Sequence, residues 1–318
     1  MNELSIRPSA IKVVPTGIHR ESLECQQSAQ VQVGPREAQR PRTPRLLSLA
    51  QQQVWTYASL AHRIPLCNTA FIVRYAGPIN QNALEQTLSE LVRRHESLRT
   101  TFATDDGIPV QIINEHQTTE LSVTDLKSLP EPEREAEVRR IAEELVRQPF
   151  ALSEGPLMRA RLLQLRYDDY VLIVALHTIV ADDWSKNVYV RELSALYKAY
   201  SAGKPSPLPD LPIHYADYAN WQKTQFGDNV IEQNVSYWRE RLAGIPAVLE
   251  LPTDRIRTAA RTFRGARESV VLPNTLRRAL EELSEREGVS LFLLLLAVFQ
   301  TLLMRYTKQD DIVVGSLI

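Results

Sequence analysis

The chain has 318 residues, which is enough for two domains or for one large domain with two lobes. It carries 37 basic and 38 acidic residues, so its formal charge is −1 and no basic field is available to attract nucleic acid or an anionic membrane. Two cysteines, Cys25 and Cys67, are too few for a disulfide framework and are typical of a reducing compartment. We therefore expect a cytoplasmic protein whose partners include neither nucleic acid nor a membrane.

The first 44 residues show no sustained hydrophobic periodicity and are rich in Gln, Arg, Pro and Ser. Prolines recur at positions 35, 41 and 44 among several charged residues. Such a composition does not supply the apolar surface that a packed core needs. Residues 1–44 are therefore predicted to be a disordered leader or linker.

From Leu46 onwards the sequence alternates between helical and strand patterns. Ser48 and Asn80 stand where their side chains would cap the first two helices, and Asp106-Gly107 is typical of a hairpin turn between two short strands. Over this part of the chain we expect helices at 47–61, 80–95, 131–148 and 186–201, and strands at 69–75, 159–165 and 170–177.

The strand expected at 170–177 ends in Val-Leu-Ile-Val-Ala-Leu-His and is apolar almost throughout. A strand with only one buried face would alternate apolar and polar residues, so this one is expected to be covered on both faces. Together with the alternating helices, this pattern predicts an α/β layered domain.

A proline-rich break at 205–212 separates this region from a second set of elements. Residues 290–306 are apolar on nearly every side but are shorter than the roughly 20 residues that span a bilayer. We therefore expect a buried core helix there. The other elements expected are helices at 215–221 and 235–242 and from 274, and strands at 268–272 and beginning at 311.

Residues 177–185, His-Thr-Ile-Val-Ala-Asp-Asp-Trp-Ser, connect the buried strand to the next helix. Ligands and catalytic groups often collect at such strand ends, where a rigid strand meets an exposed loop. Spacing alone also allows a structural interpretation, with His177 as a core histidine and Asp182 and Asp183 as helix caps. No second histidine stands one helical turn away, so no metal site is predicted. The chain has no G-x-S-x-G elbow and no phosphate-binding glycine loop.

This loop resembles the His-His-x-x-x-Asp-Gly motif of condensation domains from nonribosomal peptide synthetases, which are related to chloramphenicol acetyltransferase. Other parts of the chain resemble further motifs of the family, in the family's order. They are Ser48, Ala50, Gln51 and Trp55 of the opening motif, residues 93–102 (RRHESLRTTF), residues 149–163 (PFALSEGPLMRARLL), residues 215–222 (YADYANWQ) and the start of a fifth motif at 310–318 (DDIVVGSLI).

The resemblance implies a chloramphenicol-acetyltransferase-like αβ sandwich, with a complete first lobe at 45–225 and a partial second lobe at 226–318. It also implies the function: amide bond formation between an acyl donor and an amine acceptor. Both substrates would be carried on the phosphopantetheine arms of peptidyl or acyl carrier proteins in adjacent synthetase modules. No cofactor would be bound directly.

Three departures bear on activity. Thr178 replaces the second histidine, the residue to which the family assigns the role of base or of positioner of the acceptor amine. A threonine hydroxyl is not a base near neutral pH, although it can accept a hydrogen bond. Asp183 replaces the glycine and adds negative charge near a negatively charged intermediate, unless it serves as a substitute base. Gln53 replaces the arginine of the opening motif.

The implied site therefore consists of His177, Thr178, Asp182 and Asp183. Asp182 matches the family's aspartate, whose implied role is structural pairing with an arginine. The departures predict impaired turnover. The alternative is a catalytically silent condensation-like module that interacts with carrier proteins, or a synthetase fragment; O-acyl transfer is a weaker third hypothesis.

Overall fold

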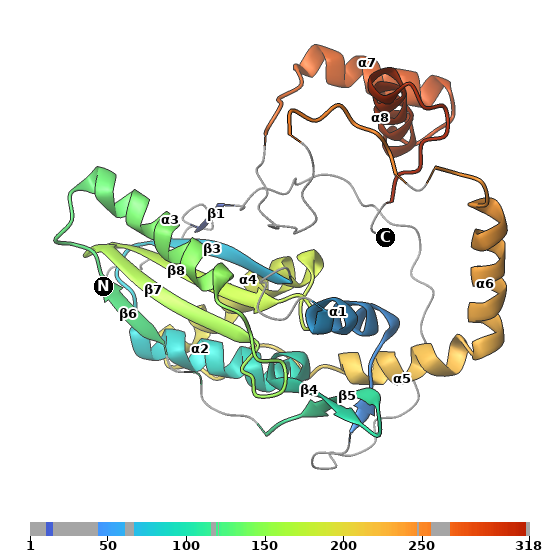
Figure 1. Cartoon of the computed structure of the whole chain (residues 1–318). Coiled ribbons are helices and arrows are strands. Elements are labelled where there is room, and N and C mark those ends of the chain that lie inside the picture. Colours follow the sequence, from blue (N-terminus) through green and yellow to red (C-terminus); the bar gives the residue numbers. More distant parts are fainter. Residues whose placement is uncertain are drawn as a thin grey trace. The chain divides into compact units, whose positions relative to one another are not determined.

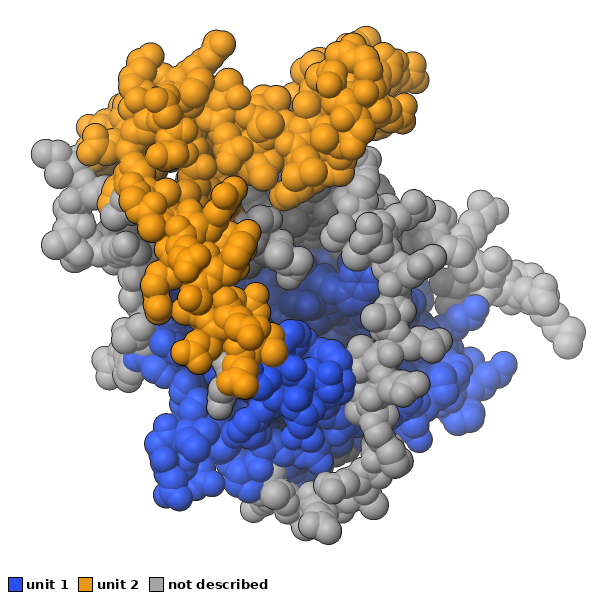
Figure 2. Space-filling model, turned by 90° about the vertical axis from the view of Figure 1, so that its right-hand side faces the viewer, with its two compact units in different colours: residues 1–227 blue, residues 228–318 orange. Residues whose placement is uncertain are grey.

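The computed structural model describes residues 11–14, 44–60, 67–115, 119, 121–246, 248–255 and 268–315. The chain forms two compact units, residues 1–227 and residues 228–318 (Figure 2). The division falls two residues after the lobe boundary expected from the sequence. Each unit is described here by itself.

The first unit is built on a five-stranded sheet (Figure 1). Strands β6 and β7 are parallel, and the other neighbouring pairs are antiparallel. The order across the sheet is β1 (Ile11–Val14), β3 (Asn68–Ala76), β8 (Asp169–His177), β7 (Met158–Arg166) and β6 (Ser122–Asp125).

Helices cover both faces of this sheet, as the apolar run at 170–177 predicted. Leu172, Val174 and Leu176 of β8 pack in one core with α2 (Gln81–Arg94) and α4 (Asp183–Ser201). The alternate residues, among them Val171 and Ile173, pack in a second core with α3 (Glu131–Arg147). The α/β layered domain is confirmed.

A smaller sheet follows the order β2 (Arg45–Leu46), β5 (Ile108–Ile113) and β4 (Thr100–Asp105). The predicted hairpin turn joins β4 to β5, and both Asp106 (φ 46°) and Gly107 (φ 80°) have the positive φ that a two-residue hairpin turn of type I′ requires. The remaining helices of the unit are α1 (Leu49–Leu60), the 3-10 helix η2 (Glu96–Arg99) and α5 (Tyr215–Gln225).

The two predicted helix caps are confirmed. The Ser48 hydroxyl accepts a hydrogen bond from the Gln51 N–H at 3.2 Å, and the Gln51 side chain accepts one from the Ser48 N–H at 3.0 Å. The Asn80 side chain accepts a hydrogen bond from the Ala83 N–H at 3.1 Å. Each cap satisfies an N–H group that the first helical turn leaves without a partner.

Four residues of the predicted leader are ordered as β1, which pairs with β3 from Ile11 opposite Tyr75 to Val14 opposite Ile72. At these four residues the structure differs from the expectation of disorder, because the edge of β3 offers backbone partners that local composition does not reveal. Residues 1–10 and 15–43 lie outside the described residues, so the prediction remains untested for them.

The second unit contains α6 (Asp228–Arg241), α7 (Asn274–Arg286) and α8 (Leu291–Thr307). The prediction of a strand at 268–272 is wrong: these residues form no strand, and Val270 and Val271 are 81% and 90% exposed. Residues 311–315 also form no strand, and 316–318 lie outside the described part. A β-branched run becomes a strand only where another strand pairs with it, and within the described part of this unit none does.

The buried core helix expected at 290–306 is a helix, α8, but none of its residues is buried. Several of its large apolar side chains, such as Phe292 (58%) and Leu293 (51%), are about half exposed. An apolar sequence predicts that a helix will be buried, but burial also requires other elements of the chain to pack against it, and the helix's own sequence does not show them. Among the described helices none alone is long and apolar enough to span a membrane; α7 and α8 together, bent by 106°, meet the criteria of length and composition.

The packing of β8 predicts a large loss of stability for Leu172→Ala. Leu172 is completely buried, so the substitution is expected to lower the free energy of unfolding by about 3 kcal/mol through lost burial and the cavity left behind. Leu49→Ala is the control: that side chain is 45% exposed, and a loss below about 1 kcal/mol is expected. Urea denaturation followed by circular dichroism measures both, and equal losses would contradict the assignment of the core.

Candidate active-site loop and cavity

His177, the last residue of β8, is a buried core histidine. Its side chain is 4% exposed, its Nδ1 accepts the Ile179 N–H at 3.2 Å, and its ring stands edge-on to Phe150 with 6.1 Å between centroids. Burial lowers the pKa of His177 to about 4. The imidazole is therefore neutral at pH 7 and, because Nδ1 is the acceptor, carries its proton on Nε2.

Thr178 is exposed and lines a cavity, in contrast to its neighbour. Its backbone N–H donates to the Cys67 carbonyl at 2.7 Å, which anchors the start of the loop beside β3. Side chains alternate between the two faces at a strand end, so Leu176 and Thr178 reach the cavity while His177 points to the opposite face. Of the two adjacent positions where the family's motif has histidines, the structure thus places only the second, Thr178, at the cavity.

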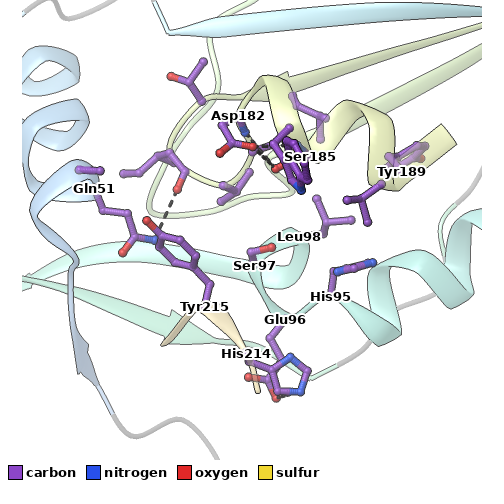
Figure 3. Close-up of a pocket in the computed structure, with 18 of the residues that line it drawn as sticks. Gln51, His95, Glu96, Ser97, Leu98, Asp182, Ser185, Tyr189, His214 and Tyr215 are labelled. Carbon is purple, nitrogen blue, oxygen red and sulfur yellow. Dashed lines mark hydrogen bonds and ion pairs between the residues drawn. The ribbon is translucent and has the colours of Figure 1, made fainter. Parts of the chain in front are cut away.

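Asp182 caps helix α4 (Figure 3). Its carboxylate accepts hydrogen bonds from the Ser185 N–H at 2.8 Å and from the Ser185 hydroxyl at 2.5 Å, and the Asp182 N–H donates to that hydroxyl at 3.1 Å. In the described parts of the chain no arginine bonds to Asp182. The carboxylate fixes the end of the loop through the helix, as the structural interpretation of the spacing allowed.

Asp183, the first residue of α4, does not line the cavity. Its side chain is 63% exposed and forms an ion pair with Lys186 at 2.6 Å. The structure therefore brings Thr178 and Asp182 to the same cavity and leaves His177 and Asp183 outside its lining.

The cavity has a volume of about 400 Å³, and all of its lining residues belong to the first unit. Figure 3 shows how most of these residues lie. Helix α1, the segment around η2, the loop, the start of α4 and the residues before α5 all contribute to the cavity. It is lined by Ala50, Gln51, Val54, His95, Glu96, Ser97, Leu98, Leu176, Thr178, Ile179, Val180, Ala181, Asp182, Trp184, Ser185, Val188, Tyr189, Leu211, Ile213, His214 and Tyr215.

Hydrogen bonds join the walls of the cavity. The Ser48 hydroxyl and the Tyr215 hydroxyl lie 3.0 Å apart, which links the start of α1 to the start of α5. The Gln51 amide donates to the Ile179 carbonyl at 3.4 Å, which links α1 to the loop. Residues of the opening and fourth motifs therefore act as a frame for the loop.

Sequence reasoning did not single out His95, Glu96 or His214 as cavity residues. Glu96 lies 3.8 Å from His214 Nε2 and 3.3 Å from the Arg99 guanidinium. His95 and Glu96 belong to the second motif, at 93–102, and His214 directly precedes the fourth, at 215–222. Proximity to these motifs was the feature of the sequence that could have indicated the three residues. No cluster of three or more His, Cys, Asp or Glu side chains that could hold a metal ion occurs among the described residues.

Comparison with known proteins identifies the family. Residues 43–318 match the sequence profile of the Condensation domain. The chain belongs to the condensation-domain family. It is 44% identical to a linear gramicidin synthase of Brevibacillus parabrevis over 89% of its length, and 41% identical to phosphinothricin tripeptide synthetase PhsC of Streptomyces viridochromogenes over 85% of its length. It spans only 4% and 25% of those proteins, respectively.

Solved structures confirm the fold and its extent. The X-domain from teicoplanin biosynthesis is 30% identical with a TM-score of 0.73, and the match covers 85% of this chain and 59% of that one. The first condensation domain of the calcium-dependent antibiotic synthetase is 22% identical with a TM-score of 0.69, covering 85% of this chain and 63% of that one. The chloramphenicol-acetyltransferase-like fold is confirmed.

The cap formed by Asp182 predicts that Asp182→Ala lowers the free energy of unfolding by about 1 kcal/mol, because the first turn of α4 loses its acceptor. Asp183→Ala is the matched control, since it removes only an exposed ion pair worth about 0.5 kcal/mol or less. Thermal or urea denaturation compares the two variants. A loss for Asp183→Ala as large as that for Asp182→Ala would contradict the role of Asp182 as the cap.

The buried neutral His177 predicts that acid destabilises the protein. Its pKa is about 4 in the folded state, so between about pH 6.5 and pH 4 the unfolded state binds a proton that the folded state excludes. Stability should fall by up to about 3 kcal/mol as the pH falls through this window. Urea denaturation of wild type and His177→Gln across this range measures the effect; equally steep pH dependences in both would contradict it.

Proposed function

We propose that the chain catalyses, at a reduced rate, the formation of an amide bond between a thioester-bound acyl donor and an amine acceptor. Both substrates would be carried on the phosphopantetheine arms of carrier proteins in adjacent synthetase modules, and no cofactor would be bound directly. The observation that carries this proposal is that Thr178 lines the cavity at the position where the family's motif has its second histidine. One of the relatives named above is a tripeptide synthetase, which supports the reaction class.

The reduced rate follows from the side chain at position 178. As the amine attacks the thioester carbonyl, a C–N bond forms and the C–S bond breaks; the nitrogen loses a proton, which ends on the departing sulfur as the thiol. A threonine hydroxyl cannot take that proton near neutral pH, although its oxygen can accept a hydrogen bond from the amine and so orient it. In this mechanism His177 and Asp182 hold the two ends of the loop, and Thr178 positions the acceptor without acting as base.

Restoring the imidazole is the direct test. Thr178→His is expected to raise product formation by about 10²- to 10⁴-fold, the usual contribution of a positioned general base. The protein is incubated with an acyl-loaded donor carrier and an aminoacyl-loaded acceptor carrier, and the condensed product is measured by intact mass. Thr178→Val is the matched control, because it keeps the branched shape and removes the hydroxyl; it should fall below wild type.

If neither wild type nor Thr178→His forms product with a panel of carriers, the enzymatic proposal is wrong. Asp183→Gly, combined with Thr178→His, restores the glycine of the motif as well as its second histidine. Asp183 lies outside the cavity lining and is paired with Lys186, so we expect this second change to add less than the first.

A second candidate function is a catalytically silent interaction module. It is supported by the match to the teicoplanin X-domain, a structure of which was solved as a complex with OxyB. It is also supported by the burial of His177, which leaves no imidazole of the motif at the cavity. Saturable binding of a carrier protein, with no product from wild type or Thr178→His, would favour this candidate over the enzyme.

A further inference from the structure

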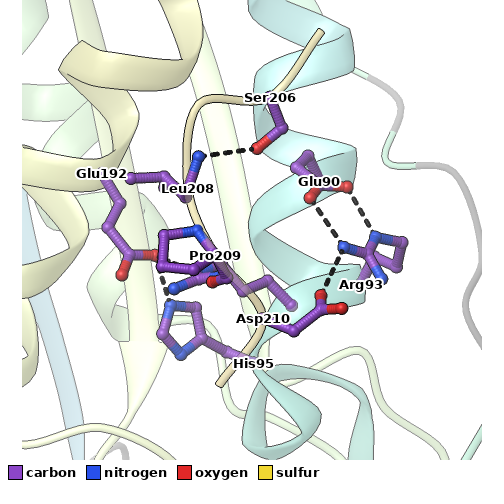
Figure 4. Close-up of polar contacts among 9 residues, drawn as sticks. Glu90, Arg93, His95, Glu192, Ser206, Leu208, Pro209 and Asp210 are labelled. Atoms are coloured by element: carbon purple, nitrogen blue, oxygen red, sulfur yellow. Dashed lines mark hydrogen bonds and ion pairs between the residues drawn. The ribbon is translucent and has the colours of Figure 1, made fainter. Parts of the chain in front are cut away.

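A histidine and a buried glutamate form a pair at the edge of the cavity. His95 Nε2 lies 2.7 Å from Glu192 Oε2, and the Arg94 Nε–H donates to the same carboxylate oxygen at 3.0 Å (Figure 4). The Glu192 and Arg94 side chains are only 7% and 6% exposed. Arg94 also donates to the Pro209 carbonyl, so both members of the ion pair are fixed in place.

This arrangement determines which nitrogen of His95 can accept a hydrogen bond. A carboxylate that is ion-paired with an arginine is an acceptor only, so Nε2 must be the donor in the contact with Glu192. A neutral imidazole has one N–H, and with that hydrogen on Nε2 its Nδ1 is left with a lone pair. Glu192 therefore makes His95 Nδ1 an acceptor.

His95 Nδ1 carries no hydrogen bond among the described residues. Within the described part of the chain it is also not among the buried side-chain polar atoms without partners, which are Tyr75 Oη and Arg99 Nε. Solvent therefore reaches it. His95 lines the cavity together with Leu98 and Tyr189 (Figure 3).

The rest of the lining indicates what kind of group fits beside His95. Among the described residues that line the cavity none is a lysine or arginine, so no side chain there supplies the fixed positive charge that favours an anionic ligand. The two carboxylates already have partners: Glu96 lies against Arg99 and His214, and Asp182 caps α4. Most of the other lining side chains are apolar or aromatic, and the volume of about 400 Å³ exceeds that of a bicyclic ring.

We propose that this cavity binds an aromatic group bearing a hydrogen-bond donor, an indole or a phenol, with His95 Nδ1 as the acceptor and Glu192 as the positioning residue that fixes the tautomer. On the proposed function, this group is the side chain of an amino-acid substrate. Binding to the cavity is measured without carrier proteins, so a failure of this inference and a failure of amide formation are separate results.

The test compares ligands of matched shape on the chain of 318 residues. Indole and 1-benzothiophene have similar shapes, but 1-benzothiophene has a sulfur where indole has an N–H group. Their affinities are measured by calorimetry at about pH 8.5, where an ordinary imidazole is neutral. We expect indole to bind about three- to tenfold more tightly, the effect of one neutral hydrogen bond. Equal affinities, or no binding of either probe, would overturn the proposal.

Two variants test whether His95 and Glu192 cause the preference for indole over 1-benzothiophene. His95→Phe keeps a ring and removes the acceptor, so the ratio of the two affinities should fall to about one. A preference for indole that survives this change would overturn the role of His95. Circular dichroism checks that the variant is folded; should it fail to fold, the comparison of the two probes on the wild-type protein remains decisive for the site.

Glu192→Gln tests the positioning role. The glutamine amide can donate to His95 Nε2, which allows the imidazole proton to move to Nδ1. The preference for indole over 1-benzothiophene should then shrink, and a ring with an acceptor nitrogen, isoquinoline, should gain on naphthalene. The imidazole ¹⁵N chemical shifts report the tautomer directly. Unchanged preferences and shifts in the folded variant would overturn the role of Glu192.

Discussion

The burial of β8 on both faces is the constraint on which the rest of the structure depends. Leu172 and its alternate neighbours pack under α2 and α4, whereas Ile173 and its neighbours pack under α3. Neither layer can shift without exposing one set of these side chains, so the end of the strand is held in place. A loop that begins there, and ends at a helix capped by Asp182, has both ends fixed by elements that do not depend on a ligand.

Elements that are distant in sequence form the walls of the cavity and are joined by hydrogen bonds. They are α1, the η2 segment, the loop and the residues before α5, and the bonds include those of Ser48 with Tyr215 and of Gln51 with Ile179. The buried pair of Arg94 and Glu192 ties the end of α2 to α4 and, through the Pro209 carbonyl, to the segment that supplies Leu211 and Ile213 to the lining. Motif side chains such as Ser48, Gln51, Arg94 and Tyr215 therefore join the walls of the cavity to one another.

The sequence predicted the features that depend on local order. The apolar run at 170–177, the caps at Ser48 and Asn80, and the Asp106-Gly107 turn were all confirmed, because periodicity, capping and positive φ are properties of a few adjacent residues. Features that depend on distant partners were missed. Residues 268–272 have no strand to pair with in the described part of the second unit, and no residue of α8 is buried. Nothing near His95 in the chain indicates that Glu192 would lie against it.

The two adjacent motif positions illustrate how backbone geometry divides roles within a motif. Because side chains alternate at the end of β8, a residue at 177 faces the core beside Phe150 and a residue at 178 faces the cavity. A histidine at 177 is desolvated, so its pKa falls to about 4 and it contributes packing and a hydrogen bond to the loop instead of proton transfer near pH 7. Exchanging the residue at 178 therefore changes the chemistry available to a substrate while leaving untouched the contacts that hold the loop, which is why a fold of this family can persist in a chain whose cavity has a threonine at that position.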